Sequence, residues 1–169
     1  AYVADGEKGL AIIDVNNPAK PAIIAQPDTN GIAYSVAIYN KYAYIADGNG
    51  GLVVIDVSNP TKIVQVGWYD TYDARSVCVQ GENVYIADGK NGLVVVNVDK
   101  IGKPTNSSNG NISQVGRYDT AGKANSVYVQ GRYAYVMDLD NGLVIIDISN
   151  PNNPRQVGWY DTAGIACGV

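Results

Sequence analysis

The sequence predicts an all-β protein made of four copies of one unit, and three observations support this fold class. The first is a recurring anchor, Ala-Asp-Gly or its variant Met-Asp-Leu, whose aspartates lie 42, 41 and 50 residues apart: Asp5, Asp47, Asp88 and Asp138. The second is the likeness of segments 51–71 and 142–162, which share 15 of 21 residues. The third is that no segment keeps a helical apolar period over three turns. Duplication of one supersecondary unit accounts for all three.

Each unit contains four short segments with the character of β-strands. The first is SVCVQ (76–80) or SVYVQ (126–130), which alternates and is rich in β-branched residues. The second, YAYIADG (42–48), shows a clear period of two. The third, LVVIDV (52–57), is a continuous apolar run, typical of a strand buried on both faces. The fourth is QVGWYDT (65–71), which ends in an Asp-Thr pair.

Turn signals separate these segments, namely Asp-Gly and Asn-Gly pairs and then Ser-Asn-Pro or Asn-Asn-Pro. About 42 residues that hold four strands match one blade of a β-propeller, whereas leucine-rich repeats are shorter and helical repeats need a 3.6-residue period. We therefore predict a single propeller domain over residues 1–169. Because both faces of a blade pack on neighbours, burial is expected for the third-strand residues Val54, Ile55, Val95 and Ile145.

Two arrangements of the blades fit the repeat count. The chain opens in the second strand of a blade, since residues 1–3 match 43–45, and it closes in the first strand of another. A four-bladed ring would result if the C-terminal strand paired beside the N-terminal one. Alternatively, the chain is a window onto a larger propeller of six to eight blades, and this alternative is slightly favoured.

Composition and charge exclude several classes of function. The net charge of −4 and the lack of any Lys/Arg cluster argue against nucleic acid and against an anionic membrane surface as partners. The apolar runs of four to six residues are far below the roughly 20 that a membrane span needs. The absence of histidine excludes a Ser-His-Asp triad and histidine-ligated metals. The two cysteines, Cys78 and Cys167, are expected to be small buried thiols.

The repeated segments also resemble a known family. GLVVIDVSNP (51–60) and GLVIIDISNP (142–151), each preceded by a motif of the type AYIADG, are similar to the repeats of LVIVD-repeat β-propellers. The resemblance covers the whole chain and implies a propeller fold. It also implies a cell-surface or secreted location, while it says little about activity. The third copy departs most, with Asn97 in place of the usual aspartate and no Asn-Pro turn.

Eight aspartates are expected on one rim of the propeller, because the loops after strands two and four lie at the same end of a blade. The first loop carries the anchor aspartates, and the second carries Asp28, Asp70, Asp119 and Asp161. Together they would produce a negative potential that attracts cations or a basic partner. The favoured interpretation is structural: each aspartate accepts backbone N–H bonds in its own turn, since the same two positions carry an aspartate in every repeat.

A candidate ligand site lies where otherwise matched repeats differ. Just before each innermost strand, the equivalent residues are Tyr34, Arg75, Asn125 and Cys167. If the first strand lines the axis, these side chains lie at the channel mouth, where propellers commonly take ligands, and Arg75 with Asp73 is the most polar pair. The competing interpretation is a set of solvated loop ends.

A weaker candidate is a calcium site at Asp138 and Asp140. The run Asp-Leu-Asp-Asn-Gly places oxygen ligands at alternating positions, as the start of a calcium loop does. It lacks a third acidic position and a distal glutamate. No other cofactor is predicted.

The third repeat carries a hydrophilic insertion over residues 100–113. It contains two N-x-Ser sequons, at Asn106 and Asn111, within the single extended loop. Glycosylation there would require an extracytoplasmic location, in agreement with the family resemblance.

These observations favour a non-enzymatic module of a cell-surface or secreted protein, acting as a scaffold or an interaction surface. Its partner would be another protein or a second copy, bound through the propeller rim or the strand edges. The alternative is a propeller enzyme of the hydrolase or oxidoreductase type, with a metal held by carboxylates at the channel mouth. Stoichiometric metal on the aspartate rim would favour the enzyme.

Overall fold

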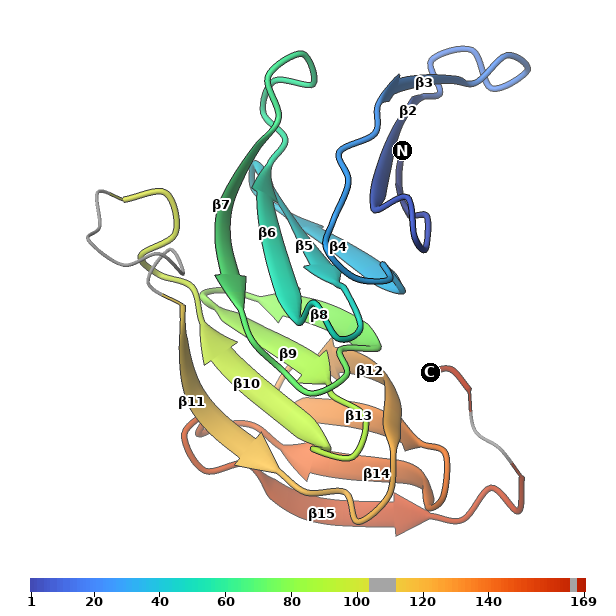
Figure 1. Cartoon of the computed structure of the whole chain (residues 1–169). Helices are drawn as coiled ribbons and strands as arrows, with labels where there is room; N and C mark the ends of the chain where they lie inside the picture. Colours follow the sequence, from blue (N-terminus) through green and yellow to red (C-terminus); the bar gives the residue numbers. More distant parts are fainter. Residues whose placement is uncertain (104–111, 165–166) are drawn as a thin grey trace.

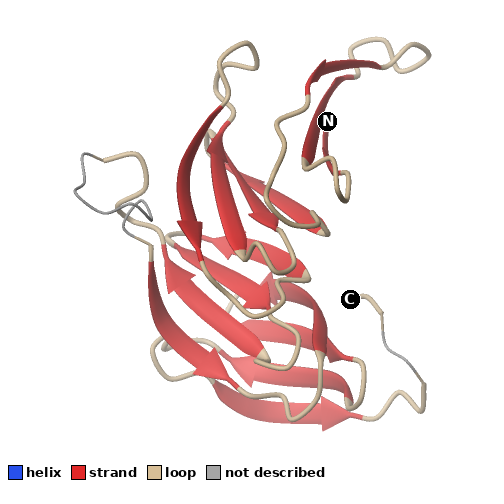
Figure 2. Ribbon diagram, in the orientation of Figure 1, coloured by secondary structure: helices blue, strands red, loops and turns tan. Residues whose placement is uncertain are grey.

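The computed structural model describes residues 1–103, 112–164 and 167–169, and over these residues the chain forms β-strands and no helix (Figure 2). The strands make four antiparallel sheets, which follow one another in chain order along an open arc (Figure 1). Each sheet corresponds to one sequence repeat. The all-β class and the organisation into propeller blades are therefore confirmed.

We number the sheets blade 1 to blade 4. Blade 1 has three strands, β1 (Tyr2–Ala4), β2 (Leu10–Asp14) and β3 (Ala22–Ala25). Blade 2 has four strands, β4 (Ser35–Tyr39), β5 (Tyr42–Ala46), β6 (Leu52–Asp56) and β7 (Val64–Tyr69). Blade 3 has β8 (Ser76–Gln80), β9 (Asn83–Ala87), β10 (Leu93–Asn97) and β11 (Ser113–Tyr118). Blade 4 has β12 (Ala124–Gln130), β13 (Tyr133–Asp138), β14 (Gly142–Asp147) and β15 (Arg155–Tyr160).

Strands within a blade pair in the order in which they occur in the chain, so β4, β8 and β12 are the innermost strands. A serine hydroxyl links β4 and β8 to the innermost strand of the following blade. The Val77 N–H donates to Ser35 Oγ at 3.4 Å, and the Val127 N–H donates to Ser76 Oγ at 3.3 Å. In the described residues, blade 1 consists of three strands, which match the second, third and fourth strands of the other blades.

The core of the molecule lies between blades, because each blade has two different apolar faces. One face, here called the tyrosine face, carries Tyr44, Leu52 and Val54 in blade 2. The opposite face, here called the valine face, carries Val84, Val94 and Val96 in the next blade. Tyrosine face packs on valine face at all three interfaces, between blades 1 and 2, 2 and 3, and 3 and 4.

Within the described residues, no further blade covers the tyrosine face of blade 4. Val54, Ile55 and Val95 are buried as predicted, but Ile145 is only half-buried. The prediction for Ile145 was wrong because its burial requires a neighbour that its own strand does not supply.

The four blades do not close into a ring. In the described part of the chain, no residue from 161 to 169 pairs with β1. The C-terminal residues instead lie beside blade 4, where Asn125 Nδ2 donates to the Cys167 carbonyl at 2.9 Å. Of the two arrangements weighed from the sequence, the closed four-bladed ring is not the one adopted.

The expectation of two buried thiols was wrong. Cys78 on β8 is half-buried, and Cys167 is exposed. Cys78 lies on the tyrosine face near the inner edge of blade 3, where it packs only at the margin of the core.

The long insertion is attached to the core at both of its ends. Ile101 and Ile112 are both buried in the cluster between blades 2 and 3. The sequon residues Asn106 and Asn111 lie outside the described residues, so glycosylation of this loop stays a prediction.

Candidate functional site

In blades 2 to 4, the anchor aspartate accepts hydrogen bonds from the chain segment that enters the blade. Asp88, at the end of β9, accepts hydrogen bonds from the Tyr72 and Asp73 N–H groups and from Asn91 Nδ2. Asp47, at the end of β5, accepts from Thr29 Oγ1 at 2.6 Å and from the Gly31 N–H at 2.8 Å. The loops after strands two and four thus meet on one rim, as predicted. Their carboxylates, however, are engaged in bonds that position the connection between blades.

Asp138 accepts hydrogen bonds both from the preceding connection and, as predicted, from its own turn. It accepts from the Asp140 and Asn141 N–H groups within the turn, both at 3.0 Å, and from Thr120 Oγ1 in the preceding connection at 2.5 Å. Asp47, Asp88 and Asp138 are all buried. Burial raises the pKa of Asp47, and the bonds from Thr29 and Gly31 oppose that rise.

The aspartates of the second loop show the predicted local turns where the structure records their bonds. Asp119 Oδ1 accepts from the Ala121 N–H at 2.9 Å, and Asp161 Oδ1 accepts from the Ala163 N–H at 2.8 Å. Bonds between residues i and i+2 of this kind define an Asx turn. Both carboxylates are exposed and remain on the rim.

The four residues predicted to surround the channel mouth do come together. A cavity of about 320 Å³, here called the mouth cavity, lies where the innermost strands begin. It is lined by the four predicted residues and by the serines of the strand starts, in the order Tyr34, Ser35, Arg75, Ser76, Asn125, Ser126 and Cys167. Because blades 2, 3 and 4 and the C-terminal segment each contribute the residue at the equivalent repeat position, the repeat places four different side chains around one hollow. That they bind a ligand stays a prediction.

Arg75 is the charged residue among the described residues that line the mouth cavity. Its Nε donates to Asp73 Oδ1 at 2.8 Å, and its guanidinium carbon lies 4.6 Å from the centre of the Tyr34 ring. The Asp73 N–H is in turn bound by the buried Asp88 at 2.7 Å. The rim hydrogen bonds therefore determine where the guanidinium lies. Stacking on an aromatic ring leaves the outer edge of the guanidinium available for a planar acceptor.

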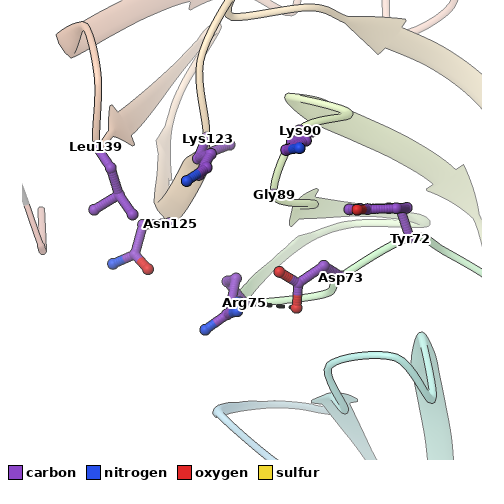
Figure 3. Close-up of a pocket in the computed structure, with 9 residues that line it drawn as sticks. Tyr72, Asp73, Arg75, Gly89, Lys90, Lys123, Asn125 and Leu139 are labelled. Carbon is purple, nitrogen blue, oxygen red and sulfur yellow. Dashed lines mark hydrogen bonds and ion pairs between the residues drawn. The ribbon is translucent and has the colours of Figure 1, made fainter.

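A second cavity of about 310 Å³ adjoins the mouth cavity and shares Arg75 and Asn125 with it (Figure 3). Lys90 from blade 3 and Lys123 from the connection into blade 4 also line it. With Arg75 they give three cationic side chains against the one carboxylate of Asp73. The sequence alone does not point to these lysines, because they lie in two different loops that only the stacking of the blades brings together. The signal that could have indicated them is their position in the sequence, shortly after the anchor Asp88 and after the Asp119-Thr120 pair.

The described residues contain no group of three or more His, Cys, Asp or Glu side chains that could hold a metal ion. The oxygens of Asp138 are engaged by turn and connection donors, and Asp140 is exposed. A calcium ion at Asp138 and Asp140 stays a prediction that this geometry does not strengthen. Over the same part of the chain, no helix is long and apolar enough to cross a membrane.

Four-stranded antiparallel sheets that stack face to face, with their first strands innermost, define a protein built from β-propeller blades. The model of the LVIVD repeat matches the chain four times, over residues 1–29, 30–71, 73–120 and 121–162. The chain therefore belongs to the LVIVD repeat family. No curated protein matches it in a sequence comparison.

Proposed function

We propose that this propeller module is a non-enzymatic binding module that takes an anionic ligand at the mouth cavity. The observation that supports the proposal is the convergence of four non-equivalent side chains, Tyr34, Arg75, Asn125 and Cys167, at equivalent positions of the repeat. A purely structural position would tolerate the same residue in every blade, as the serine that follows does in blades 2 to 4.

The chemistry of the mouth cavity favours a carboxylate or a similar planar anion. Arginine carries five N–H donors in a fixed fork, and only Nε of Arg75 is engaged with Asp73. The outer N–H groups of that fork match the two oxygens of a carboxylate. Lys90 and Lys123 add positive potential at the adjoining cavity, whereas the molecule as a whole is acidic.

The test is an NMR titration of the isotopically labelled chain with sodium glucuronate, a small carboxylate probe, and with glucose as its neutral counterpart. Glucuronate should shift the signals of Arg75 and Asn125, glucose should not, and Arg75→Gln should abolish the response. Arg132→Gln is the matched control, because Arg132 also pairs with an aspartate, Asp147, and lies 5.4 Å from the Tyr133 ring centre, yet lines neither cavity. Equal responses in the two variants, or shifts spread over the whole rim, would refute a site at the mouth.

A cell-surface or secreted location is part of this proposal, and the family resemblance supports it. The absence of an enzymatic role is likewise proposed, because the anchor carboxylates are engaged in fold-defining hydrogen bonds. Protease treatment of intact cells that produce the full-length protein tests the location. Protection of the protein in intact cells, with digestion only after lysis, would contradict it.

A further inference from the structure

The cavity of about 310 Å³ beside the mouth cavity, here called the interblade cavity, gathers positive charge. Its lining comes from blades 3 and 4 and the connections that enter them, all within residues 72–139. Three of the twelve lysine and arginine residues of the chain line it, namely Arg75, Lys90 and Lys123. Figure 3 shows the arginine and the two lysines on different sides of the hollow. A chain of net charge −4 thus places a quarter of its cationic side chains around one cavity.

The two lysines of the interblade cavity have no anionic partner in the part of the chain that the structure describes. Arg75 pairs with Asp73, whereas the other ion pairs of these residues involve neither Lys90 nor Lys123. Both lysines are exposed. Cationic groups that line one cavity without a neutralising carboxylate create a positive potential, which favours a ligand with more than one negative charge.

The repeat itself shows that the fold does not require these cations. One repeat earlier, the positions of Arg75, Lys90 and Lys123 are held by residues without positive charge, namely Tyr34, Asn49 and Asp73. Blades 2 and 3 nevertheless stack through the same pair of apolar faces as blades 3 and 4 do. The positive charge is therefore a property of this one interface and not of the blade architecture.

The connection into blade 3 also departs from the repeat. From its Asp-Thr pair to the buried alanine before the innermost strand, it is one residue shorter than the connections into blades 2 and 4. Thr29 and Thr120 donate to the anchor aspartate of the blade they enter, whereas Thr71 Oγ1 is buried with no hydrogen-bond partner among the described residues. An unpaired buried hydroxyl destabilises a fold. The same short connection presents Tyr72, which is 58% exposed, to the interblade cavity.

The outer side of the two lysines limits the length of an anionic ligand. There Lys90 and Lys123 line a third cavity of about 360 Å³ together with the exposed carboxylates of Asp119 and Asp140. A polyanion that ran outward across the rim would meet these carboxylates. A ligand that runs inward from the lysines meets Arg75, which the interblade and mouth cavities share.

We propose that the ligand is a short acidic oligosaccharide, with one uronate at Arg75 and the neighbouring uronate at Lys90 and Lys123. This inference rests on the proposed function, which places a carboxylate at the mouth cavity. The Tyr72 ring provides an amphipathic surface for the apolar face of a sugar, and the Asn125 amide provides a partner for sugar hydroxyls. An acidic peptide would supply the carboxylates without a flat ring for Tyr72.

The test is an NMR titration of the isotopically labelled full chain with galacturonate and its 1,4-linked dimer and trimer. The dimer should bind at least about tenfold more tightly than galacturonate, because its second carboxylate binds within a complex that the first has already formed. The dimer should also shift the signals of Lys90 and Lys123. The trimer should gain no more than about twofold over the dimer, because its third carboxylate would approach the carboxylates of the rim.

A paired substitution identifies the groups that the second uronate contacts. The double variant Lys90→Gln, Lys123→Gln should bring the dimer to the affinity of galacturonate. Its control, Lys8→Gln with Lys62→Gln, makes the same change in net charge at two exposed lysines that line neither cavity, and should keep the gain. A gain that persists in the first variant would overturn the assignment to Lys90 and Lys123.

Two further results separate this inference from the proposed function. Galacturonate that binds at Arg75, with no gain for the dimer in the wild-type chain, would overturn the oligosaccharide and leave the proposed function in place. No response of Arg75 to any uronate would overturn the proposed function and this inference with it. Triglutamate, which carries carboxylates without sugar rings, should bind more weakly than the dimer, and equal binding would overturn the sugar class.

Discussion

Blades 3 and 4 are built from equivalent strands, yet their tyrosine faces are in different environments. Leu93 and Val95 of blade 3 are fully buried, whereas Leu143 and Ile145 at the same positions of blade 4 are half-buried. The strand pairings within the two blades match, with the same irregularity between the third and fourth strands. The difference comes entirely from the presence or absence of the next blade.

This comparison shows that a blade's own sequence determines its strands, while its neighbour determines how much its residues contribute to stability. Repeat proteins of this kind have a free energy of unfolding that is close to a sum of terms for repeats and for nearest-neighbour interfaces. Blade 4 has one such interface and blade 3 has two. Four paired experiments, taken from the largest expected difference to the smallest, test this description.

The largest difference is expected for leucine at the start of the third strand. Leu93→Ala should lower the free energy of unfolding by about 2–5 kcal/mol, because it leaves a cavity between blades 3 and 4. Leu143→Ala should cost about 1 kcal/mol, since part of that side chain is already in water. Urea denaturation at a concentration that keeps the chain monomeric measures both. Equal losses would show that the tyrosine face of blade 4 is covered in solution.

Alanine substitutions at the equivalent glycines Gly116 and Gly158 should give almost as large a difference in stability. Gly116→Ala should destabilise the protein by about 1–3 kcal/mol, because the added methyl group clashes with the Pro151 carbonyl. Gly158→Ala should change stability by less than about 0.5 kcal/mol, because the added methyl group would meet only Ile145 of its own blade. Thermal unfolding of the two variants, side by side with the wild type, measures the difference. A strongly destabilised Gly158→Ala would contradict this environment of Gly158.

Alanine substitution of the anchor aspartates provides a comparison of the stability contributions in an internal blade and in blade 1. Asp88→Ala should cost about 1–3 kcal/mol, because it leaves the Tyr72 and Asp73 N–H groups without their acceptor. Asp5→Ala removes only a bond from Gln26 on an exposed carboxylate and should cost less than about 1 kcal/mol. Chemical denaturation followed by tyrosine fluorescence can compare them. A similar cost at both sites would show that these bonds act mainly within their own turns.

The smallest difference is expected in acid, at hairpins that face solvent in both blades. The bonds from Ser58 and Lys41 lower the pKa of Asp56 to about 2, and those from Arg132 and Ser149 lower the pKa of Asp147 as well. A carboxyl whose pKa is lower in the folded state stabilises the fold above its ordinary pKa, and this contribution is lost as pH falls through the folded value. Stability should therefore decline between about pH 4 and pH 2.

Asp56→Asn and Asp147→Asn should each flatten that decline to a similar extent, as measured by urea midpoints at several pH values. A pH profile identical to that of the wild type would contradict the assigned bonds. A large difference between the two variants would show that the neighbouring blade affects these hairpins too.

Most of the fold could be predicted from the sequence because the repeat displays the same strands several times. Segment 76–80 coincides with β8, and segment 126–130 lies within β12. The gathering of Tyr34, Arg75 and Asn125 was predictable for the same reason, since equivalent positions in successive blades must lie around one axis.

The predictions that the structure corrects all concern residues whose environment is set by contacts between blades. The half-burial of Ile145 could not be predicted from an apolar strand, because the missing neighbour leaves no local mark in that strand. The aspartates were expected to cap their own turns, and their bonds to the preceding connection bridge 15 to 18 residues. The joint position of Lys90 and Lys123 could not be predicted, because they come from different loops that only the stacked blades bring together.

Ile101 and Ile112 also have a practical consequence. They fasten both ends of the third-repeat insertion to the core between blades 2 and 3, so the two chain ends that a foreign segment would have to join are already fixed. The entropic cost of closing a flexible loop grows slowly, by about 0.6 kcal/mol for each doubling of its length. A peptide epitope or a small domain grafted between these two isoleucines should therefore be displayed with little loss of stability, which makes this position the natural attachment point for an engineered display scaffold.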